Sequence, residues 1–211
     1  MIKTILLIIL SIPLLIIILH TIVRIIRFFY KFPMPQFLAN VIDNPLRRKI
    51  QPPEITGFRH GIKSGMSVLE VGPGNGRYTV EAAKIVGPNG RITTIDIENK
   101  MIERVKQRIK KENITNINAE VANVYNLPYQ DNSFDLIYMI AVFNEIPEQG
   151  KALREFHRVL KPNGLLVFSE LFMDPDYPLS KTLIKKVQRS SFKLNEKIGN
   201  FFYYTLKFEK I

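Results

Sequence analysis

The stretch Val68-Leu69-Glu70-Val71-Gly72-Pro73-Gly74-Asn75-Gly76 decides the fold of this chain. Its apolar first half is typical of a buried strand, and three glycines at alternate positions follow where a helix is expected to begin. Because glycine has no Cβ, such a loop can turn sharply and let the backbone approach a ligand. The amides at the start of the following helix would favour a phosphate or a carboxylate there.

Strands and helices alternate along the rest of the chain. Apolar runs predict strands at residues 67–72, 91–97, 116–121, 134–140, 165–171, 192–198 and 201–208. Helices are expected at residues 54–62, 78–86, 100–111, 149–160 and 179–188. This alternation indicates an α/β fold with a mostly parallel sheet covered by helices. Gly199-Asn200, between the last two strands, predicts a tight antiparallel hairpin at the C-terminal edge of a seven-stranded sheet.

Asp96 closes the second predicted strand, where a carboxylate can accept hydrogen bonds from both hydroxyls of a ribose. A glycine triplet between a strand and a helix, followed by an acid at the end of the next strand, indicates an adenosine-containing ligand. Dinucleotide sites use the spacing G-x-G-x-x-G. Here the third glycine comes one residue early and is followed by Arg77, so the pattern favours another adenosine ligand.

The spacing E-x-G-x-G-x-G resembles the first motif of the class I S-adenosylmethionine-dependent methyltransferases. Asp96 is similar to the acid of their second motif, and residues 123–129 and 131–135 resemble the third and fourth motifs. Residues 153–167 (LREFHRVLKPNGLLV) resemble the branch that contains quinone-biosynthesis C-methyltransferases and many small-molecule enzymes. The resemblance covers residues 66–171 well, the terminal hairpin loosely and residues 1–50 not at all. It implies a Rossmann-like fold and S-adenosyl-L-methionine as the cofactor.

The resemblance also implies roles for the residues of the glycine loop. Gly72, Gly74 and Gly76 would approach the methionine end of the cofactor, and Glu70 would support the loop.

Four further cofactor-binding residues follow from the same resemblance. Asp96 would hold the ribose, Ile97 would pack beside the adenine, and Val124 would offer its backbone amide to a ring nitrogen. Asn123 would face the adenine amino group. It departs from the family's usual aspartate, and without a full charge its hydrogen bond would be weaker.

The sequence leaves the catalytic residues unassigned, because methyl transfer requires a general base only for some nucleophiles. Asn144 and Glu145 follow the fourth predicted strand, at the edge of the sheet where α/β proteins contact their ligands. They are the candidates for substrate contact, although Glu145 could equally begin the next helix. A small, lipophilic methyl acceptor is expected.

The chain begins with an apolar segment. Residues 4–23 carry no formal charge, and a helix of that length would span a bilayer core of about 30 Å. A cleaved signal peptide and a buried helix are the alternatives. Basic residues after the run place its C-terminal side in the cytoplasm. We therefore expect a transmembrane anchor at 1–32, a helical lead-in or lid at 33–62 and a methyltransferase domain at 63–211. The protein would be a single-pass membrane protein with a cytoplasmic catalytic domain and the lipid bilayer as a partner.

The composition argues against several classes. There is no cysteine and the three histidines are scattered, so no metal site is expected. The net charge of +11 suggests an anionic partner without identifying it. Residues 144–147 lack the proline pair of nucleic-acid amino-methyltransferases, which argues against a nucleic-acid partner. The Y-x-x-x-K pattern of short-chain dehydrogenases occurs at 177–181, but Pro178 is poorly placed in its helical turn. An RNA or protein methyltransferase and a non-catalytic cofactor-binding module tethered to the membrane stay as alternatives.

Overall fold

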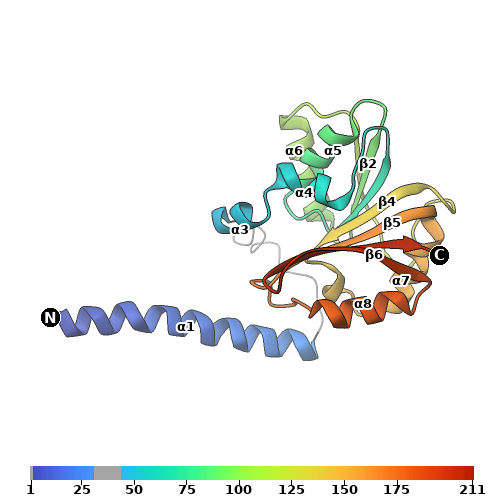
Figure 1. Cartoon of the computed structure of the whole chain (residues 1–211). Coiled ribbons are helices and arrows are strands. Elements are labelled where there is room, and N and C mark those ends of the chain that lie inside the picture. Colours follow the sequence, from blue (N-terminus) through green and yellow to red (C-terminus); the bar gives the residue numbers. More distant parts are fainter. Residues whose placement is uncertain (1, 31–43) are drawn as a thin grey trace.

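The computed structural model describes residues 2–30 and 44–211 (Figure 1). Within these residues, three helices precede the sheet: α1 (Ile2–Phe29), α3 (Pro45–Ile50) and α4 (Pro53–His60). The strands are β1 (Ser67–Val71), β2 (Arg91–Asp96), β3 (Ile117–Val121), β4 (Phe134–Ile140), β5 (Leu160–Leu171), β6 (Phe192–Gly199) and β7 (Tyr203–Lys210). Between them lie α5 (Arg77–Val86), α6 (Asn99–Lys111), the short 3-10 helix η2 (Phe143–Glu145), α7 (Gln149–Val159) and α8 (Ser180–Gln188).

The strands form one seven-stranded sheet in the order β3-β2-β1-β4-β5-β7-β6. Neighbours from β3 to β5 pair in parallel, whereas β7 pairs antiparallel with both β5 and β6. The predicted Rossmann-like α/β fold with an antiparallel C-terminal hairpin is therefore confirmed. The chain leaves β1 toward β2 on one side and later returns to β4 on the other side. The carboxyl ends of β1 and β4 thus lie at a point where the strand order reverses, which is where α/β sheets bind ligands.

Helices cover both faces of the sheet (Figure 1). Successive side chains of β1 point to opposite faces, as the pleat of a strand requires. Val68 therefore packs in one buried cluster with Ala83 of α5, and Leu69 packs in the other cluster with Phe156 of α7. The two clusters fix the helices on either side of the sheet and leave its carboxyl edge for the loops.

One predicted strand boundary and one predicted turn differ from the structure. Strand β5 begins at Leu160, which pairs with Phe134, so it starts five residues before the predicted strand at 165–171. Within this strand Asn163 has the positive φ of 62° that its side chain tolerates. The hairpin connection is longer than the predicted Gly199-Asn200 turn. Asn200 Oδ1 accepts hydrogen bonds from the backbone amides of Phe202 and Tyr203. Strand β7 consequently begins at Tyr203.

Helix α1 extends away from the α/β domain and meets it at its C-terminal end (Figure 1). At that end His20 Nε2 lies 3.0 Å from the carbonyl oxygen of Met173, and the Arg24 guanidinium stacks 5.0 Å from the ring centroid of Phe172. Arg27 is only 3% exposed and reaches acidic side chains of the domain. The last third of α1 is therefore part of the packing of the domain.

These contacts correct the predicted localisation. In the part of the chain that the structure describes, no helix combines the length and the apolar character needed to cross a membrane. The apolar run leads into the C-terminal end of α1, where the side chains of His20, Arg24 and Arg27 contact the α/β domain. The hydrophobicity of the run does not predict these contacts. The predicted single-pass membrane localisation, with its cytoplasmic orientation, is wrong, and the bilayer is not supported as a partner.

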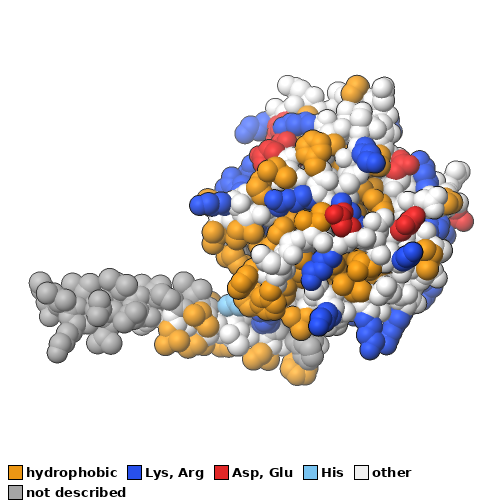
Figure 2. Space-filling model, in the orientation of Figure 1, with side chains coloured by type: hydrophobic (Ala, Val, Ile, Leu, Met, Phe, Trp, Pro, Cys, Tyr) orange, Lys and Arg blue, Asp and Glu red, His pale blue; other side chains and the backbone are white. Residues whose placement is uncertain are grey.

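Figure 2 shows one face of the molecule, on which Lys and Arg side chains are spread among hydrophobic and uncharged ones. Hydrophobic side chains gather there beside the end of α1 (Figure 2). Exposed large hydrophobic residues near this region include Phe29 on α1 and Phe201 and Phe202 between β6 and β7. The net positive charge is therefore not concentrated in one patch on this face.

Candidate functional site

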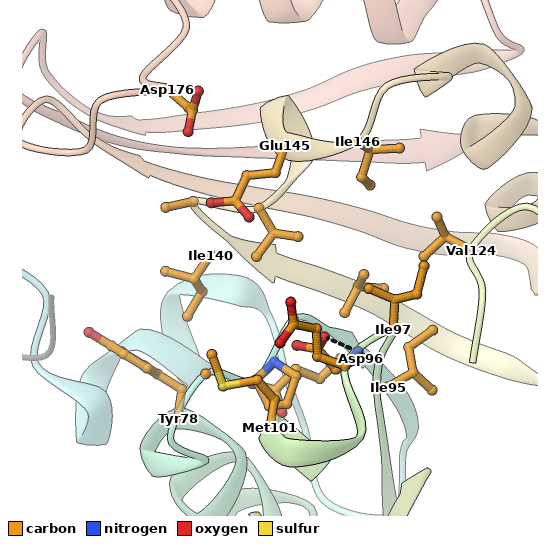
Figure 3. Close-up of a pocket in the computed structure, with 18 of the residues that line it drawn as sticks. Tyr78, Ile95, Asp96, Ile97, Met101, Val124, Ile140, Glu145, Ile146 and Asp176 are labelled. Atoms are coloured by element: carbon orange, nitrogen blue, oxygen red, sulfur yellow. Dashed lines mark hydrogen bonds between the residues drawn. The ribbon is translucent and has the colours of Figure 1, made fainter. Parts of the chain in front are cut away.

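A cavity of about 360 Å³ lies at the carboxyl edge of the parallel strands (Figure 3). It is lined by loops that follow β1, β2, β3, β4 and β5, together with residues of α3, α5 and α6. The predicted site residues that line it are Glu70, Gly72, Gly74, Asp96, Ile97, Asn123, Val124 and Glu145. Gly76 and Asn144 do not belong to its lining. The cavity therefore brings together eight of the ten residues selected from the sequence.

The three glycines of the loop are required for different reasons. All three have positive φ, at 71° for Gly72, 57° for Gly74 and 75° for Gly76. A Cβ on Gly72 would lie 2.5 Å from Cγ2 of Val142, so the loop packs tightly against the loop after β4. A Cβ on Gly74 would meet no atom of the described residues within 4 Å, which leaves room for a ligand. Gly76 instead packs against Val105 of α6 and begins α5.

Glu70 lies beneath the loop, and the residue is 2% exposed. Its Oε2 accepts a hydrogen bond of 2.5 Å from Thr79 Oγ1, which ties β1 to α5. Burial raises the pKa of the Glu70 carboxyl, although hydrogen bonds from Thr79, Tyr138 and Thr94 oppose this shift. The side chain can thus hold the glycine loop in place from below.

Asp96 lies at the end of β2 on the wall of the cavity (Figure 3). Its Oδ1 accepts a hydrogen bond of 2.9 Å from the amide of Glu98, which fixes the carboxylate. Burial raises the pKa of this carboxyl to about 6, against the effect of that hydrogen bond. Ile97, which follows, is 58% exposed beside the cavity and offers an apolar surface. A carboxylate and an apolar side chain therefore lie next to each other, as a ribose and its base would need.

The loop after β3 contributes the next part of the wall. Val124 lines the cavity, and its side chain is drawn in Figure 3. Asn123 Oδ1 accepts a hydrogen bond of 3.0 Å from the amide of Tyr125, so this side chain also fixes the local turn. An adenine amino group would have to share that oxygen with the turn.

Acidic side chains occupy the side of the cavity away from Asp96 (Figure 3). Glu145 Oε1 lies 3.1 Å from Arg27 Nη2, and Arg27 also forms an ion pair with Asp176. Asn144 does not face this space, because its Nδ2 donates a hydrogen bond of 2.5 Å to the carbonyl oxygen of Asp176. Asn144 thus positions the loop after β5, and Glu145 is the one of the pair that reaches the cavity.

The sequence did not single out Asp174 and Asp176, nor the role of Arg47, although all three line the cavity. The segment after β5 supplies both aspartates. Arg47 of α3 donates a hydrogen bond of 3.1 Å from Nη1 to Asp174 Oδ1. The signal that points to them is the acidic pair directly after a parallel strand, at the carboxyl edge of the sheet. The lead-in at 33–62 meets the cavity through Arg47, and its residues 33–43 lie outside the described residues.

Comparisons with known proteins agree with this geometry. A family model described as "Methyltransferase domain" matches residues 62–208. The ubiquinone/menaquinone biosynthesis C-methyltransferase UbiE of Pasteurella multocida is 32% identical over 143 residues, covering 66% of this chain and 51% of that protein. The demethylmenaquinone methyltransferase of Staphylococcus aureus is 34% identical over 123 residues, covering 58% and 50%. The matched segment thus spans about half the length of these curated relatives.

Solved structures support the same fold. An S-adenosylmethionine-dependent methyltransferase from Aquifex aeolicus aligns with a TM-score of 0.78 at 23% identity, covering 85% of this chain and all of that one. The [4+2]-cyclase SpnF aligns with a TM-score of 0.66 at 18% identity, covering 75% and 79%. Because one of these proteins is a cyclase, the fold alone does not decide the reaction.

The residues present fit the expected cofactor. The open space beside Gly74 and the fixed carboxylate of Asp96 lie on one cavity, at the point where the strand order reverses. The expected use of S-adenosyl-L-methionine is supported by the family match and by the relatives. Together with the match over residues 62–208, this places the chain in the class I S-adenosylmethionine-dependent methyltransferase family.

Proposed function

We propose that this protein transfers a methyl group from S-adenosyl-L-methionine to a carbon atom of a small, lipophilic, quinone-related ring. The observation that carries the proposal is the single cavity that joins the glycine loop and Asp96 to a separate wall beside Glu145. Its volume of about 360 Å³ lies within the range of small-molecule pockets. The names of the relatives from Pasteurella multocida and Staphylococcus aureus support the choice of acceptor class.

The predicted cofactor roles are distributed along one side of the cavity. The backbone at Gly72 and Gly74 would approach the methionine end, above the support that Glu70 provides. Asp96 would accept hydrogen bonds from the ribose hydroxyls. The space beside Gly74 supports this reading, since any other residue would place a Cβ in it.

The adenine would lie between apolar side chains. Ile97 and Val124 both line the cavity near Asp96 and can pack against the faces of a purine. Asn123 would accept a hydrogen bond from the amino group while it keeps its contact with Tyr125. Gly76 would not contact the cofactor. It would support the loop by fixing the start of α5.

The cofactor supplies an electrophilic methyl group, so the protein has to orient an acceptor atom in line with it. The wall opposite Asp96 would hold the acceptor, and apolar residues such as Ile140, Val142 and Ile146 give it a surface suited to a ring. Orientation of two reactants in this way can contribute up to about 7–11 kcal/mol to lowering the barrier.

The test uses the purified full chain, methyl-labelled S-adenosyl-L-methionine and 1,4-dihydroxynaphthalene kept reduced under anaerobic conditions. We expect a ring-methylated product, identified by mass spectrometry and by carbon NMR of the labelled methyl group. Labelled RNA or protein after incubation with a cell extract would favour an RNA or protein substrate instead. Tight cofactor binding with no labelled product in any fraction would favour the non-catalytic module.

A further inference from the structure

Arg47 and Asp174 form a buried ion pair in the wall of the cavity. Arg47 is 7% exposed and Asp174 is 9% exposed. One carboxylate oxygen, Asp174 Oδ1, receives the hydrogen bond from Arg47 Nη1. The other, Asp174 Oδ2, is buried and has no hydrogen-bond partner among the residues that the structure describes, and neither has Arg47 Nε. A buried carboxylate oxygen without a donor is costly, and a bound ligand that supplies the donor would explain it.

Two other carboxylates that line the cavity share one arginine. Glu145 and Asp176 both form ion pairs with Arg27 from α1. Among the residues that the structure describes, Asp174 Oδ2 is the lining carboxylate oxygen that is buried without a hydrogen-bond partner. This oxygen is therefore the candidate to receive a proton from a molecule in the cavity.

The surroundings of Asp174 adjust its basicity. Burial raises the pKa of the Asp174 carboxyl, Arg47 opposes that shift, and Asp176 adds to it from the same loop. His20 on α1 lowers the pKa of Asp174 slightly. Glu170 at the end of β5 is also buried, and burial raises the pKa of its carboxyl well above the ordinary value. A carboxylate with a raised pKa is a better match for a phenolic hydroxyl, whose pKa is about 10 in tyrosine.

We propose that Asp174 is a catalytic residue, whose Oδ2 accepts the hydroxyl proton of a phenolic methyl acceptor while Arg47 holds Oδ1 in position. The inference rests on the proposed function, since it assumes an acceptor that carries a hydroxyl on the ring to be methylated. It adds to that function the group that activates the ring.

The step balances without an oxidant or a reductant. The O–H bond of the acceptor breaks and its proton moves to Asp174 Oδ2, while the electron pair increases the negative charge on the ring carbon. That carbon forms the bond to the methyl carbon, and the electron pair of the broken methyl–sulfur bond stays on sulfur. The methylated ring carbon then loses its hydrogen as a proton to water. Asp174 returns its proton to the ring oxygen, and the aromatic hydroquinone is restored.

The first experiment compares the wild-type full chain with Asp174→Asn, using labelled cofactor and reduced 1,4-dihydroxynaphthalene. The asparagine keeps an oxygen for Arg47 but cannot accept the proton. We expect kcat to fall by about 10²–10⁴-fold, with the affinity for S-adenosyl-L-methionine unchanged by calorimetry. The wild-type rate should fall as the pH is lowered and Asp174 becomes protonated, and the variant should lose this dependence. Asp131→Asn, an exposed aspartate outside the cavity, is the matched control and should retain the wild-type profile.

A second measurement separates this inference from the proposed function. Calorimetry compares the binding of 1,4-dihydroxynaphthalene and its dimethyl ether, which has no hydroxyl proton to donate. If the diol donates a hydrogen bond to the charged Asp174, the wild type should bind it about tenfold to hundredfold more tightly than the dimethyl ether. Asp174→Asn should abolish most of this difference in affinity. If no acceptor is methylated, the proposed function fails, while this preference still tests Asp174. Equal binding of the two compounds to the wild type, or a variant with the wild-type kcat and pH profile, would overturn the inference.

Discussion

Arg27 and Glu145 form a buried ion pair, with 3.1 Å between Arg27 Nη2 and Glu145 Oε1. The pair joins the C-terminal end of α1 to the loop that follows β4, in the wall of the cavity. Arg27 also pairs with Asp176 in the loop after β5. One arginine from α1 therefore compensates the negative charges of two carboxylates that line the cavity.

Replacing Arg27 by alanine should destabilise the domain. Removal of one partner leaves a buried charge uncompensated, at a cost of about 3–5 kcal/mol. We expect the free energy of unfolding, measured by urea denaturation, to fall by that amount in Arg27→Ala. Lys106→Ala removes an exposed pair with Glu103 and should cost no more than about 1 kcal/mol. Equal stability of the two variants would show that α1 does not dock through Arg27.

Cofactor affinity should depend on Asp96 and on its ionisation. Since burial raises the pKa of Asp96 to about 6, the carboxylate becomes protonated as the pH falls through 6 and loses one acceptor position. We expect wild-type affinity for S-adenosyl-L-methionine to weaken below pH 6 and to be nearly constant above pH 7. Asp96→Asn should bind about tenfold to hundredfold more weakly, without this pH dependence. Titration calorimetry from pH 5 to 8 measures both effects, with Glu103→Gln on α6 as the control.

The glycine loop allows a matched pair of substitutions. Gly72→Ala combines a positive φ with a Cβ only 2.5 Å from Val142 Cγ2, so strain and overpacking should each cost about 1–3 kcal/mol of stability. Gly74→Ala has a positive φ but no contact, so it should cost less stability and should instead weaken cofactor binding. Adding Val142→Ala should restore part of the stability lost in Gly72→Ala and none of the affinity lost in Gly74→Ala. Denaturation and calorimetry on the same samples separate the two effects, and the reverse pattern would contradict the geometry.

Local sequence patterns predicted the sheet and one side of the site. The alternation of Val68 and Leu69 between the two buried clusters, the glycine loop and Asp96 all follow from short-range rules. Glu145, Asp174 and Asp176 line the cavity, and their ion pairs with Arg27 and Arg47 join segments far apart in the chain. The sequence has no periodic signal for such contacts. The apolar run before Arg27 was interpreted by its length and hydrophobicity, whereas the position of Arg27 depends on the acids that it meets.

The stability of the protein in mild acid should depend on His60. This residue is 1% exposed, and its Nε2 lies 2.8 Å from Ser169 Oγ. Burial, together with the positive charges of Lys207 and Arg59, lowers the pKa of His60 to about 3. The unfolded chain has an ordinary histidine with a pKa of about 6.5. Between these values the unfolded state binds a proton that the folded state does not bind, so the free energy of unfolding falls as the pH is lowered below 6.5.

Because each pH unit corresponds to about 1.4 kcal/mol, His60 should lower stability by about 2 kcal/mol between pH 6.5 and 5. Buried carboxyls with raised pKa, such as Glu70 and Glu170, act in the opposite direction, so the total profile does not isolate His60. The prediction is therefore a difference. Relative to the wild type, His60→Asn should gain about 2 kcal/mol when urea denaturation is moved from pH 6.5 to 5. Ser169→Ala removes the hydrogen-bond partner but keeps the histidine, and it should retain the wild-type slope. A wild type and a His60→Asn variant with parallel stability profiles over this range would mean that His60 is protonated in the folded protein.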